Sequence, residues 1–242
     1  MRDVNKPLEL SFYMFLIQLI DISVVDNSML SLIEMKYEWR DEQLQWHPAM
    51  FGNLTSIRVS ADIMWKPDII MWNSISDGFN TYYDVDIIIT HNGTINWFPP
   101  GLMRTSCSVQ TRQYPFEKQS CEFMFGSWTH TKETVTIKHI DPVFNENGDA
   151  HAMIKSSDSY HYESTEWNVM LEESTGVVTE NTYPCCPGQV YQTALFHIVA
   201  YRDRRGPVIT VMLPCLLTSI LAILTFFVPP SAGEKIGLSK LI

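Results

Sequence analysis

Residues 83–98 read YDVDIIITHNGTINWF, two runs rich in β-branched and aromatic residues that are separated by Asn92-Gly93. An Asn-Gly pair readily adopts the positive φ angles of a tight turn, so the stretch predicts a β-hairpin. The aromatic and branched residues on both sides of the turn suit a pleated, half-buried surface. This stretch therefore places the surrounding chain in the β class.

Further strands are predicted on both sides of this hairpin. Residues 133–140, ETVTIKHI, and residues 191–201, YQTALFHIVAY, alternate apolar and polar side chains, which directs one face of each strand at a core. Residues 12–20, FYMFLIQLI, indicate a buried strand rather than a signal peptide, because charged residues precede them and no small-residue cleavage site follows. The chain is expected to lack its targeting sequence. The pattern predicts a mainly β fold, an immunoglobulin-like β-sandwich over residues 1–203, with a long exposed loop at 141–166.

A membrane-spanning helix is predicted directly after the sandwich. Residues 208–228, VITVMLPCLLTSILAILTFFV, contain no charged residue. At 1.5 Å per residue such a helix is about 30 Å long, which matches the hydrocarbon thickness of a bilayer. With its flanks the predicted segment is 204–230, and Pro214 is tolerated within it because membrane helices accept proline. Hardly any linker separates sandwich and helix, so movement of the sandwich can reach the bilayer.

Composition excludes some classes of protein. Hydrophobic residues make up 45% of the chain and charged residues 18%, which suits a folded core. The formal net charge of −10 argues against nucleic acid as a partner and favours cations.

Cysteines and glycosylation motifs indicate an extracellular domain. Four cysteines fall outside the apolar run and one, Cys215, within it, which is typical of an oxidising compartment. Asn53 and Asn92 each begin an Asn-x-Thr glycosylation motif.

No enzyme motif is present. The chain contains no Gly-x-Ser-x-Gly, His-Glu-x-x-His or phosphate-binding glycine loop. Its histidines are dispersed without metal-ligand spacing, so neither a metal nor a cofactor is expected. The adjacent Cys185 and Cys186 lack the two intervening residues of catalytic dithiols.

Several motifs in order identify a family. Cys107 to Cys121 enclose SVQTRQYPFEKQS, with an aromatic-Pro-Phe-acidic centre at residues 114–117. WKPD at 65–68, PPG at 99–101, FGSW at 125–128, LPC at 213–215 and GEK at 233–235 accompany it. Together they resemble the Cys-loop receptors, the pentameric neurotransmitter-gated channels, and among them the nicotinic acetylcholine receptor subunits of α type. The resemblance runs from about residue 7 to the end of the sequence, so it covers most of a ligand-binding domain, a first membrane helix and the start of a second, pore-lining helix at 231–242.

The resemblance implies a fold and a ligand site. The family's extracellular domain is a sandwich of ten strands after an N-terminal helix, and agonist binds between neighbours in a ring of five. Disulfides are implied for Cys107 with Cys121 and for the vicinal pair Cys185–Cys186. The principal face of the site is implied to contain Trp72, Trp128, Tyr183 and Tyr191, next to Cys185 and Cys186.

The implied site residues fit their ligand on physical grounds. A quaternary ammonium has no N–H to donate, so desolvated aromatic faces hold it best. Core packing is the preferred interpretation for the other tryptophans, which are Trp39, Trp46, Trp65 and Trp167.

Departures from the family pattern qualify this picture. Trp72 stands where relatives usually carry tyrosine, and Glu34 stands where the complementary face carries an aromatic residue. This subunit is therefore expected to work on its principal side, within a heteromer. Met124 and Thr193 replace the lysine and the acid of a relay between agonist capture and gating, so coupling must use other contacts.

Residues for gating and ion selection follow from the same resemblance. Pro115, Phe116 and Glu117 are expected to face the junction with the membrane, where Arg202 precedes the first helix. Glu234, in Gly-Glu-Lys, is implied in cation selection, because a ring of carboxylates concentrates cations. An acid favoured by the dipole of a helix N-terminus is the structural alternative for Glu234.

These features give two functional hypotheses. The first is a subunit of an acetylcholine-gated cation channel in the plasma membrane, postsynaptic, in which closure of the 183–191 loop over agonist moves the membrane helices. Its partners would be acetylcholine or a related cationic amine, other receptor subunits in a heteropentamer and the lipid bilayer. The alternative is a non-conducting truncated subunit, or a ligand trap like the acetylcholine-binding proteins. A membrane-anchored adhesion domain would leave the four aromatic residues unexplained.

Overall fold

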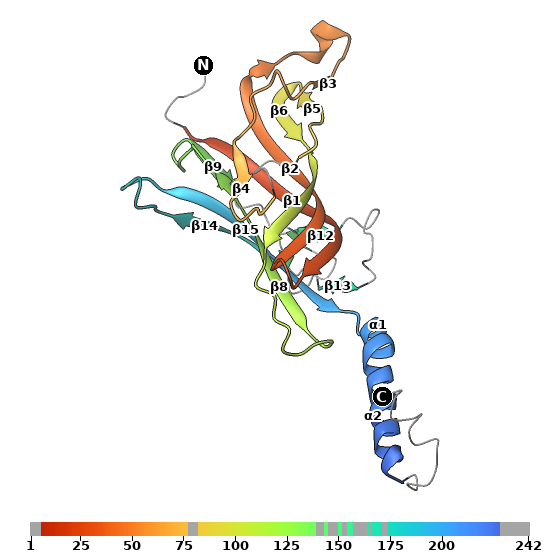
Figure 1. Cartoon of the computed structure of the whole chain (residues 1–242). Coiled ribbons are helices and arrows are strands. Elements are labelled where there is room, and N and C mark those ends of the chain that lie inside the picture. Colours follow the sequence, from red (N-terminus) through yellow and green to blue (C-terminus); the bar gives the residue numbers. More distant parts are fainter. Residues whose placement is uncertain are drawn as a thin grey trace.

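In the part of the chain that the structure describes, two large β-sheets pack together and an apolar helix follows them (Figure 1). The computed structural model describes residues 6–76, 82–138, 143–144, 150–151, 154–156, 164, 166–170 and 174–227. The larger sheet contains β1 (Leu8–Ser23), β2 (Ser28–Gln45), β3 (Ser56–Val59), β5 (Ile87–Thr90), β6 (Asn92–Trp97), β7 (Pro100–Ser106), β9 (Val135–Lys138) and β12 (Ile154–Ser156). The smaller contains β4 (Ile69–Met71), β8 (Lys118–Ser127), β13 (Trp167–Val169), β14 (Thr175–Asn181) and β15 (Tyr191–Arg202). The predicted fold class, a β-sandwich followed by a helix, is confirmed.

Short strands account for the differences from the expected strand pattern. Within the described residues the two sheets contain eight and five strands, more than the expected ten, because short segments such as β3 and β13 pair as separate strands. β12 pairs in parallel with β1, with Met14 opposite Ile154, so the prediction of an exposed loop is wrong for residues 154–156. Backbone pairing at a sheet edge needs no apolar pattern, which is why the polar sequence gave no sign of it. A further pair, β10 (Val143–Phe144) with β11 (Ala150–His151), lies in the same predicted loop.

Aromatic side chains from both sheets form the centre of the core. Phe12 on β1 lies 5.4 Å from Phe125 on β8 and 5.8 Å from Phe196 on β15, measured between ring centroids. β1, predicted as a buried strand, alternates buried and less buried residues as far as Leu16, where a register shift changes which side chains face inward. No helix precedes β1 among the residues that the structure describes from residue 6 onward.

The predicted hairpin is present as β5 and β6, in which Ile88 pairs with Asn96. The turn lies at His91, while Asn92 and Gly93 begin β6. Gly93 has φ +83°, and a Cβ there would lie 2.4 Å from the carbonyl oxygen of Asp41, so only glycine fits.

The predicted membrane helix runs from Arg205 to Phe227, is long and apolar enough to cross a bilayer, and has a mean hydropathy of 2.4 with none of its apolar window buried. Its parts are α1 (Arg205–Pro207), a π-turn (Val208–Met212), α2 (Leu213–Leu224) and a final 3-10 turn (Thr225–Phe227). The π-turn ends two residues before Pro214, whose missing N–H interrupts the α-helical ladder. The helix starts three residues before the predicted apolar run, and the predicted segment 231–242 lies outside the described residues.

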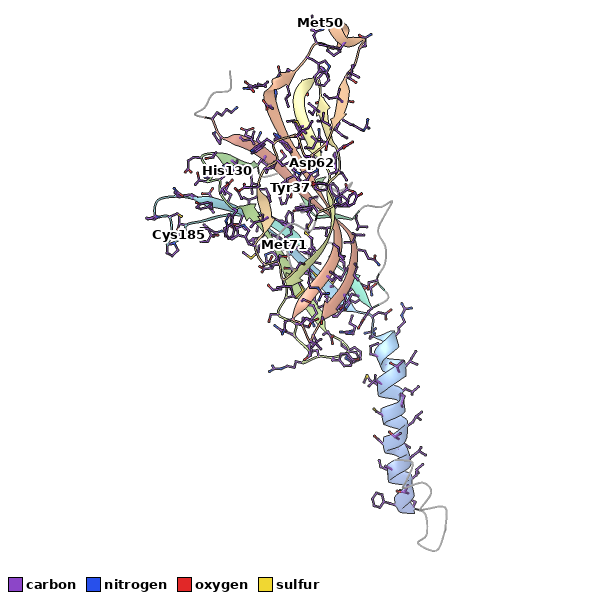
Figure 2. All side chains as sticks on the ribbon, turned by 45° about the horizontal axis from the view of Figure 1, so that its top comes forward. Tyr37, Met50, Asp62, Met71, His130 and Cys185 are labelled. Atoms are coloured by element: carbon purple, nitrogen blue, oxygen red, sulfur yellow. A yellow bond between two sulfur atoms is a disulfide. The ribbon has the colours of Figure 1, made fainter. Side chains whose placement is uncertain are left out.

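Another helical turn lies at the far end of the sandwich. A 3-10 turn (Pro48–Phe51) connects β2 to β3 and ends at Gly52, which has φ +63°. Figure 2 shows Met50 of this turn at the end of the molecule that is farthest from the membrane helix. This turn and the apolar helix therefore lie at opposite ends of the described chain.

Candidate ligand-binding site

The five-stranded sheet brings together three segments that are far apart in the sequence. Its strand order is β13-β15-β8-β4, and β14 also pairs with β15. Trp72 follows β4, Trp128 follows β8, and the hairpin of β14 and β15 carries Tyr183 and Tyr191. Residues 182–190, the hairpin loop, connect these two strands. Figure 2 shows Cys185 of this loop at the side of the sandwich, well away from the membrane helix.

The four aromatic residues predicted from the sequence form a row, called the aromatic cluster here. The ring centroids of Trp128 and Trp72 are 5.9 Å apart, those of Trp72 and Tyr183 5.3 Å, and those of Tyr183 and Tyr191 5.7 Å. Trp128, at one end of the row, has 61% of its surface exposed. Ring faces carry a negative electrostatic potential, so this arrangement can attract a cation at its open end.

Gly126 allows Trp72 to lie close to the sheet. The indole Nε1 of Trp72 donates a hydrogen bond to the carbonyl oxygen of Gly126 over 3.2 Å. A Cβ on Gly126 would lie 3.1 Å from that nitrogen and 3.0 Å from the carbonyl oxygen of Gln192. Because both distances are shorter than ordinary van der Waals contacts, any other residue at position 126 would displace the ring or the strand.

Asp68 fixes the backbone on both sides of Trp128. Its carboxylate accepts hydrogen bonds from the Ser127 hydroxyl at 2.5 Å, the Thr129 amide at 2.7 Å and the Thr129 hydroxyl at 2.6 Å. Partial burial by itself would raise the pKa of Asp68, but the hydrogen bonds from Ser127 and Thr129 outweigh it and hold the pKa below its ordinary value. The charged carboxylate therefore holds the residues on both sides of Trp128 in place.

Backbone hydrogen bonds shape the hairpin loop. The amide of Cys186 donates to the carbonyl of Tyr183 at 3.0 Å, and the amide of Gln189 donates to the carbonyl of Cys186 at 3.1 Å. Gly188 takes φ +83° within this turn. The sulfur atoms of Cys185 and Cys186 lie 2.8 Å apart and are not bonded in the structure. The vicinal disulfide implied by the resemblance stays a prediction.

The predicted gating residues lie at the opposite end of the sheet from the aromatic cluster. A disulfide joins Cys107 to Cys121 and closes the loop that contains Pro115, Phe116 and Glu117. Pro115 is buried and Phe116 is exposed. Arg202 donates from Nε to Oε1 of Glu117 over 2.6 Å, and only 6% and 2% of the two side chains are exposed.

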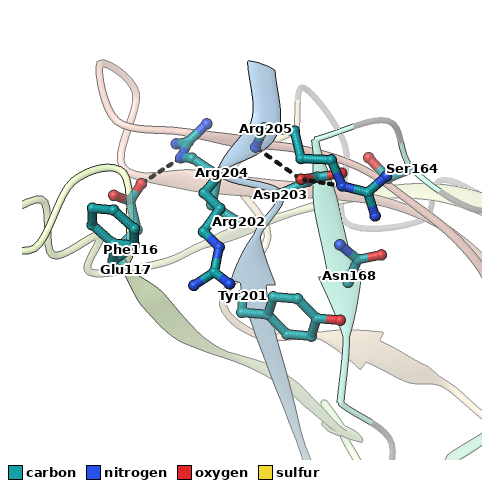
Figure 3. Close-up of a pocket in the computed structure, with 9 residues that line it drawn as sticks. All are labelled: Phe116, Glu117, Ser164, Asn168, Tyr201, Arg202, Asp203, Arg204 and Arg205. Atoms are coloured by element: carbon teal, nitrogen blue, oxygen red, sulfur yellow. Dashed lines mark hydrogen bonds and ion pairs between the residues drawn. The ribbon is translucent and has the colours of Figure 1, made fainter. Parts of the chain in front are cut away.

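Arg202 has further partners around a polar cavity. It forms an ion pair with Glu166, and its guanidinium carbon lies 4.3 Å from the ring centroid of Trp167. The cavity, of about 680 Å³, lies between Phe116 and the start of the helix at Arg205 (Figure 3). The sequence analysis assigned Trp167 to core packing only. No residue near Trp167 in the sequence indicates that its ring will lie beneath the Arg202 guanidinium.

The remaining predicted residues lie apart from the cluster. Asn53 and Asn92 are exposed, as glycosylation requires. Glu34 lies on β2 of the larger sheet, where partial burial raises its pKa. Glu234 falls outside the described residues. Across the described part of the chain, no group of three or more His, Cys, Asp or Glu side chains is arranged to hold a metal.

The other tryptophans divide between core and surface. Trp39 and Trp167 are buried, and Trp46 packs against the core from its edge. Trp65 has 49% of its surface exposed, so the core interpretation is wrong for it. Its ring contacts Trp39 at 6.1 Å and His130 at 6.5 Å, outside the aromatic cluster.

The sequence prediction missed two residues that shape the site, Asp68 and Gly126. Both belong to motifs that carried the resemblance, WKPD at 65–68 and FGSW at 125–128. The motifs were therefore the available signal for these two residues. The hydrogen bond between Asp68 and Ser127 joins residues 59 positions apart, so neither motif alone could predict it.

Comparison with known proteins agrees with the motifs. Residues 1–204 match the family model described as the neurotransmitter-gated ion-channel ligand binding domain. The chain is 35% identical over 239 residues to the acetylcholine receptor subunit alpha-type acr-15 of Caenorhabditis elegans, covering 98% of this chain and 46% of that protein. It is 32% identical over 227 residues to the neuronal acetylcholine receptor subunit alpha-2 of Mus musculus, covering 94% and 41%. It is 30% identical over 224 residues to the acetylcholine receptor subunit alpha-L1 of Schistocerca gregaria, covering 91% and 39%. The chain thus spans less than half the length of these relatives.

Proposed function

Because the chain belongs to the family of neurotransmitter-gated ion-channel ligand-binding domains, we propose that it binds a cationic agonist, acetylcholine or a related amine, at the aromatic cluster. The observation that carries this proposal is the unbroken row of four rings with the exposed Trp128 at its end. Cation–π attraction is the interaction that a quaternary ammonium can make with such a surface. The matched family is one of channel receptors and not of enzymes.

The whole protein is proposed to be a subunit of an acetylcholine-gated cation channel. Its relatives are acetylcholine receptor subunits, and its apolar helix is long enough to cross a bilayer. In this proposal residues 1–203 lie outside the plasma membrane, on the postsynaptic side, 204–230 cross the bilayer, and 231–242 begin the pore helix, where Glu234 favours cations. Glu34 on the complementary side favours assembly with other subunits in a heteropentamer.

Strand β15 supplies a route from ligand to membrane in this proposal. Tyr191 begins the strand within the aromatic cluster, and Arg202 ends it at the pair with Glu117. Only Asp203 and Arg204 separate the strand from the helix. A movement of the hairpin loop over bound agonist would therefore reach the helix through one strand.

Replacing Trp128 by alanine tests the ligand site. Loss of the exposed ring should raise the Kd of radiolabelled acetylcholine about tenfold, which follows from a cation–π contribution of about 0.5–2 kcal/mol per ring. Binding is measured on membranes that contain the full-length subunit assembled with its partner subunits. Trp65→Ala is the matched control, because Trp65 is also half-exposed but lies outside the cluster. An unchanged Kd in Trp128→Ala would remove the cluster from the binding site.

A further inference from the structure

Lys132, in the loop between β8 and β9, contacts both arms of the β14–β15 hairpin. Its Nζ lies 2.5 Å from Oε1 of Glu180, near the end of β14. Its backbone amide donates to the carbonyl of Val190, the residue before β15, over 2.8 Å. The hairpin loop is therefore attached at both of its ends to the loop that begins with Trp128.

Neighbouring polar groups extend this contact into both strands and into β9. Gln192, opposite Glu180 in the hairpin, donates from Nε2 to the same Glu180 oxygen at 3.5 Å. Its Oε1 accepts from the amide of Ile137 on β9 at 2.7 Å. Thr136 donates to the carbonyl of Lys132 at 2.7 Å, which fixes the loop to β9. Three elements meet at one ion pair.

The ion pair is exposed, so it is weak and easily opened. The side chains of Lys132 and Glu180 are 40% and 50% exposed, and pairs of this kind are screened by salt. The pKa of Glu180 is lowered, chiefly by the hydrogen bond from Lys132, so the carboxylate is charged at neutral pH. Met124 and Thr193, which replace the lysine and the acid of the relay found in relatives, carry no charge, and Thr193 accepts a hydrogen bond from Asn181 at 3.2 Å.

We propose that Lys132 and Glu180 form a releasable clasp that holds the hairpin loop against the Trp128 loop and slows the departure of a cationic ligand from the aromatic cluster. The part that concerns the ligand rests on the proposed function. Both residues act by positioning the loop, since the ligand would meet the rings and not the ion pair.

Hydrogen exchange of the ligand-free chain tests the clasp without reference to any ligand. In detergent micelles, Lys132→Gln and Glu180→Gln should each raise the exchange rate of the Lys132 amide and of peptides from residues 182–190 roughly two- to fivefold. The double variant should exchange no faster than either single one, because all three lack the same contact. The swap Lys132→Glu with Glu180→Lys should restore slow exchange. Lys138→Gln, which breaks an exposed pair with Glu9 of 2.6 Å, is the matched control and should leave these peptides unchanged.

Ligand dissociation provides the second readout. The dissociation rate of radiolabelled acetylcholine from assembled receptors that contain the full-length subunit should rise roughly two- to fivefold in both single variants and return to its original value in the swap. High salt should reduce the difference between wild type and variants, since it screens the pair.

The outcomes separate the two proposals. Exchange that is unchanged in both single variants, or that rises additively in the double variant, overturns the clasp. In another outcome, hydrogen exchange changes as expected while acetylcholine dissociates from wild type and from all variants at the same rate. That result overturns the proposal that the clasp slows ligand departure. If exchange changes as expected but assembled receptors that contain the wild-type subunit and its partner subunits bind no acetylcholine, the loop contact stands and the proposed function fails.

Discussion

The aromatic cluster and the Arg202 junction lie at opposite ends of the same sheet and are stabilised in opposite ways. The cluster is a row of uncharged rings, one of them largely exposed, and its charged groups, Asp68 and the Lys132–Glu180 pair, lie at its margin. The junction is a buried ion pair whose second carboxylate oxygen, Oε2 of Glu117, has no hydrogen-bond partner within the described residues. Removing a ring from the cluster removes one cation–π attraction. Removing one charge from the junction leaves the other charge buried without a partner. Mutations at the two ends should therefore separate loss of affinity from loss of stability.

The largest effect is expected at the junction. Arg202→Met should lower the free energy of unfolding by about 3–5 kcal/mol, because it leaves the carboxylate of Glu117 buried without its partner. The midpoint of urea unfolding, followed by tryptophan fluorescence in detergent micelles, measures this loss. The double variant Glu117→Leu with Arg202→Met should recover much of it, since no buried charge remains. Arg205→Met, which removes an exposed arginine next to the same cavity, is the control. If Arg202→Met lowers the free energy of unfolding no more than Arg205→Met does, the buried ion pair does not stabilise the junction. The contrast between the junction and the cluster would then be wrong.

A smaller effect is expected where the cluster meets the sheet. Gly126→Ala inserts a Cβ against the Trp72 indole and the Gln192 carbonyl, which should cost about 1–3 kcal/mol of stability by overpacking. The Kd for acetylcholine should rise along with it, because Trp72 must shift within the row. Urea unfolding and acetylcholine binding measure the two effects. Gly206→Ala is the control, since a Cβ there meets open space. Normal affinity in Gly126→Ala would mean that the position of Trp72 is not critical to the site.

The smallest effect is expected at the margin of the cluster, and it depends on pH. Asp68→Asn should lower stability at pH 7 by about 1–2 kcal/mol, because the charged acceptor of three hydrogen bonds is lost. The folded-state pKa of Asp68 lies below its ordinary value, so its contribution is complete above the unfolded pKa, about 3.9, and is lost as pH falls through the lower folded pKa. The urea midpoints of wild type and Asp68→Asn should therefore approach each other as pH falls below about 4.

The control for this experiment is Asp62→Asn. Asp62 is exposed, and its carboxylate accepts a single long hydrogen bond of 3.4 Å from the Ser60 hydroxyl. If the difference in urea midpoint between wild type and Asp68→Asn does not change with pH, the effect does not come from the charge of the Asp68 carboxylate.

Local pattern was enough to predict the sheets and the helix. Alternation identified β1, β9 and β15, because side chains on a strand point to opposite faces with period two. Absence of charge over 208–228 identified the helix. The aromatic residues of the cluster came from motifs, because each lies beside a recognisable segment. Contacts between distant segments could not be predicted, because nothing local to Lys132 indicates that Glu180 will face it, and nothing near Trp167 places it under Arg202.

Strand β15 is hydrogen-bonded on both sides along its length, to β14 and then β13 on one side and to β8 on the other. Sliding it by one residue would exchange its buried and exposed faces and drive Phe196 and Ile198 out of the core. The shortest slide that restores the pattern is two residues, or about 7 Å, and it would break every ladder at once. The register of the strand is therefore fixed, and the strand cannot slide within the sheet. Any motion that travels along it from the cluster to the apolar helix must be a tilt or a twist of the whole sheet.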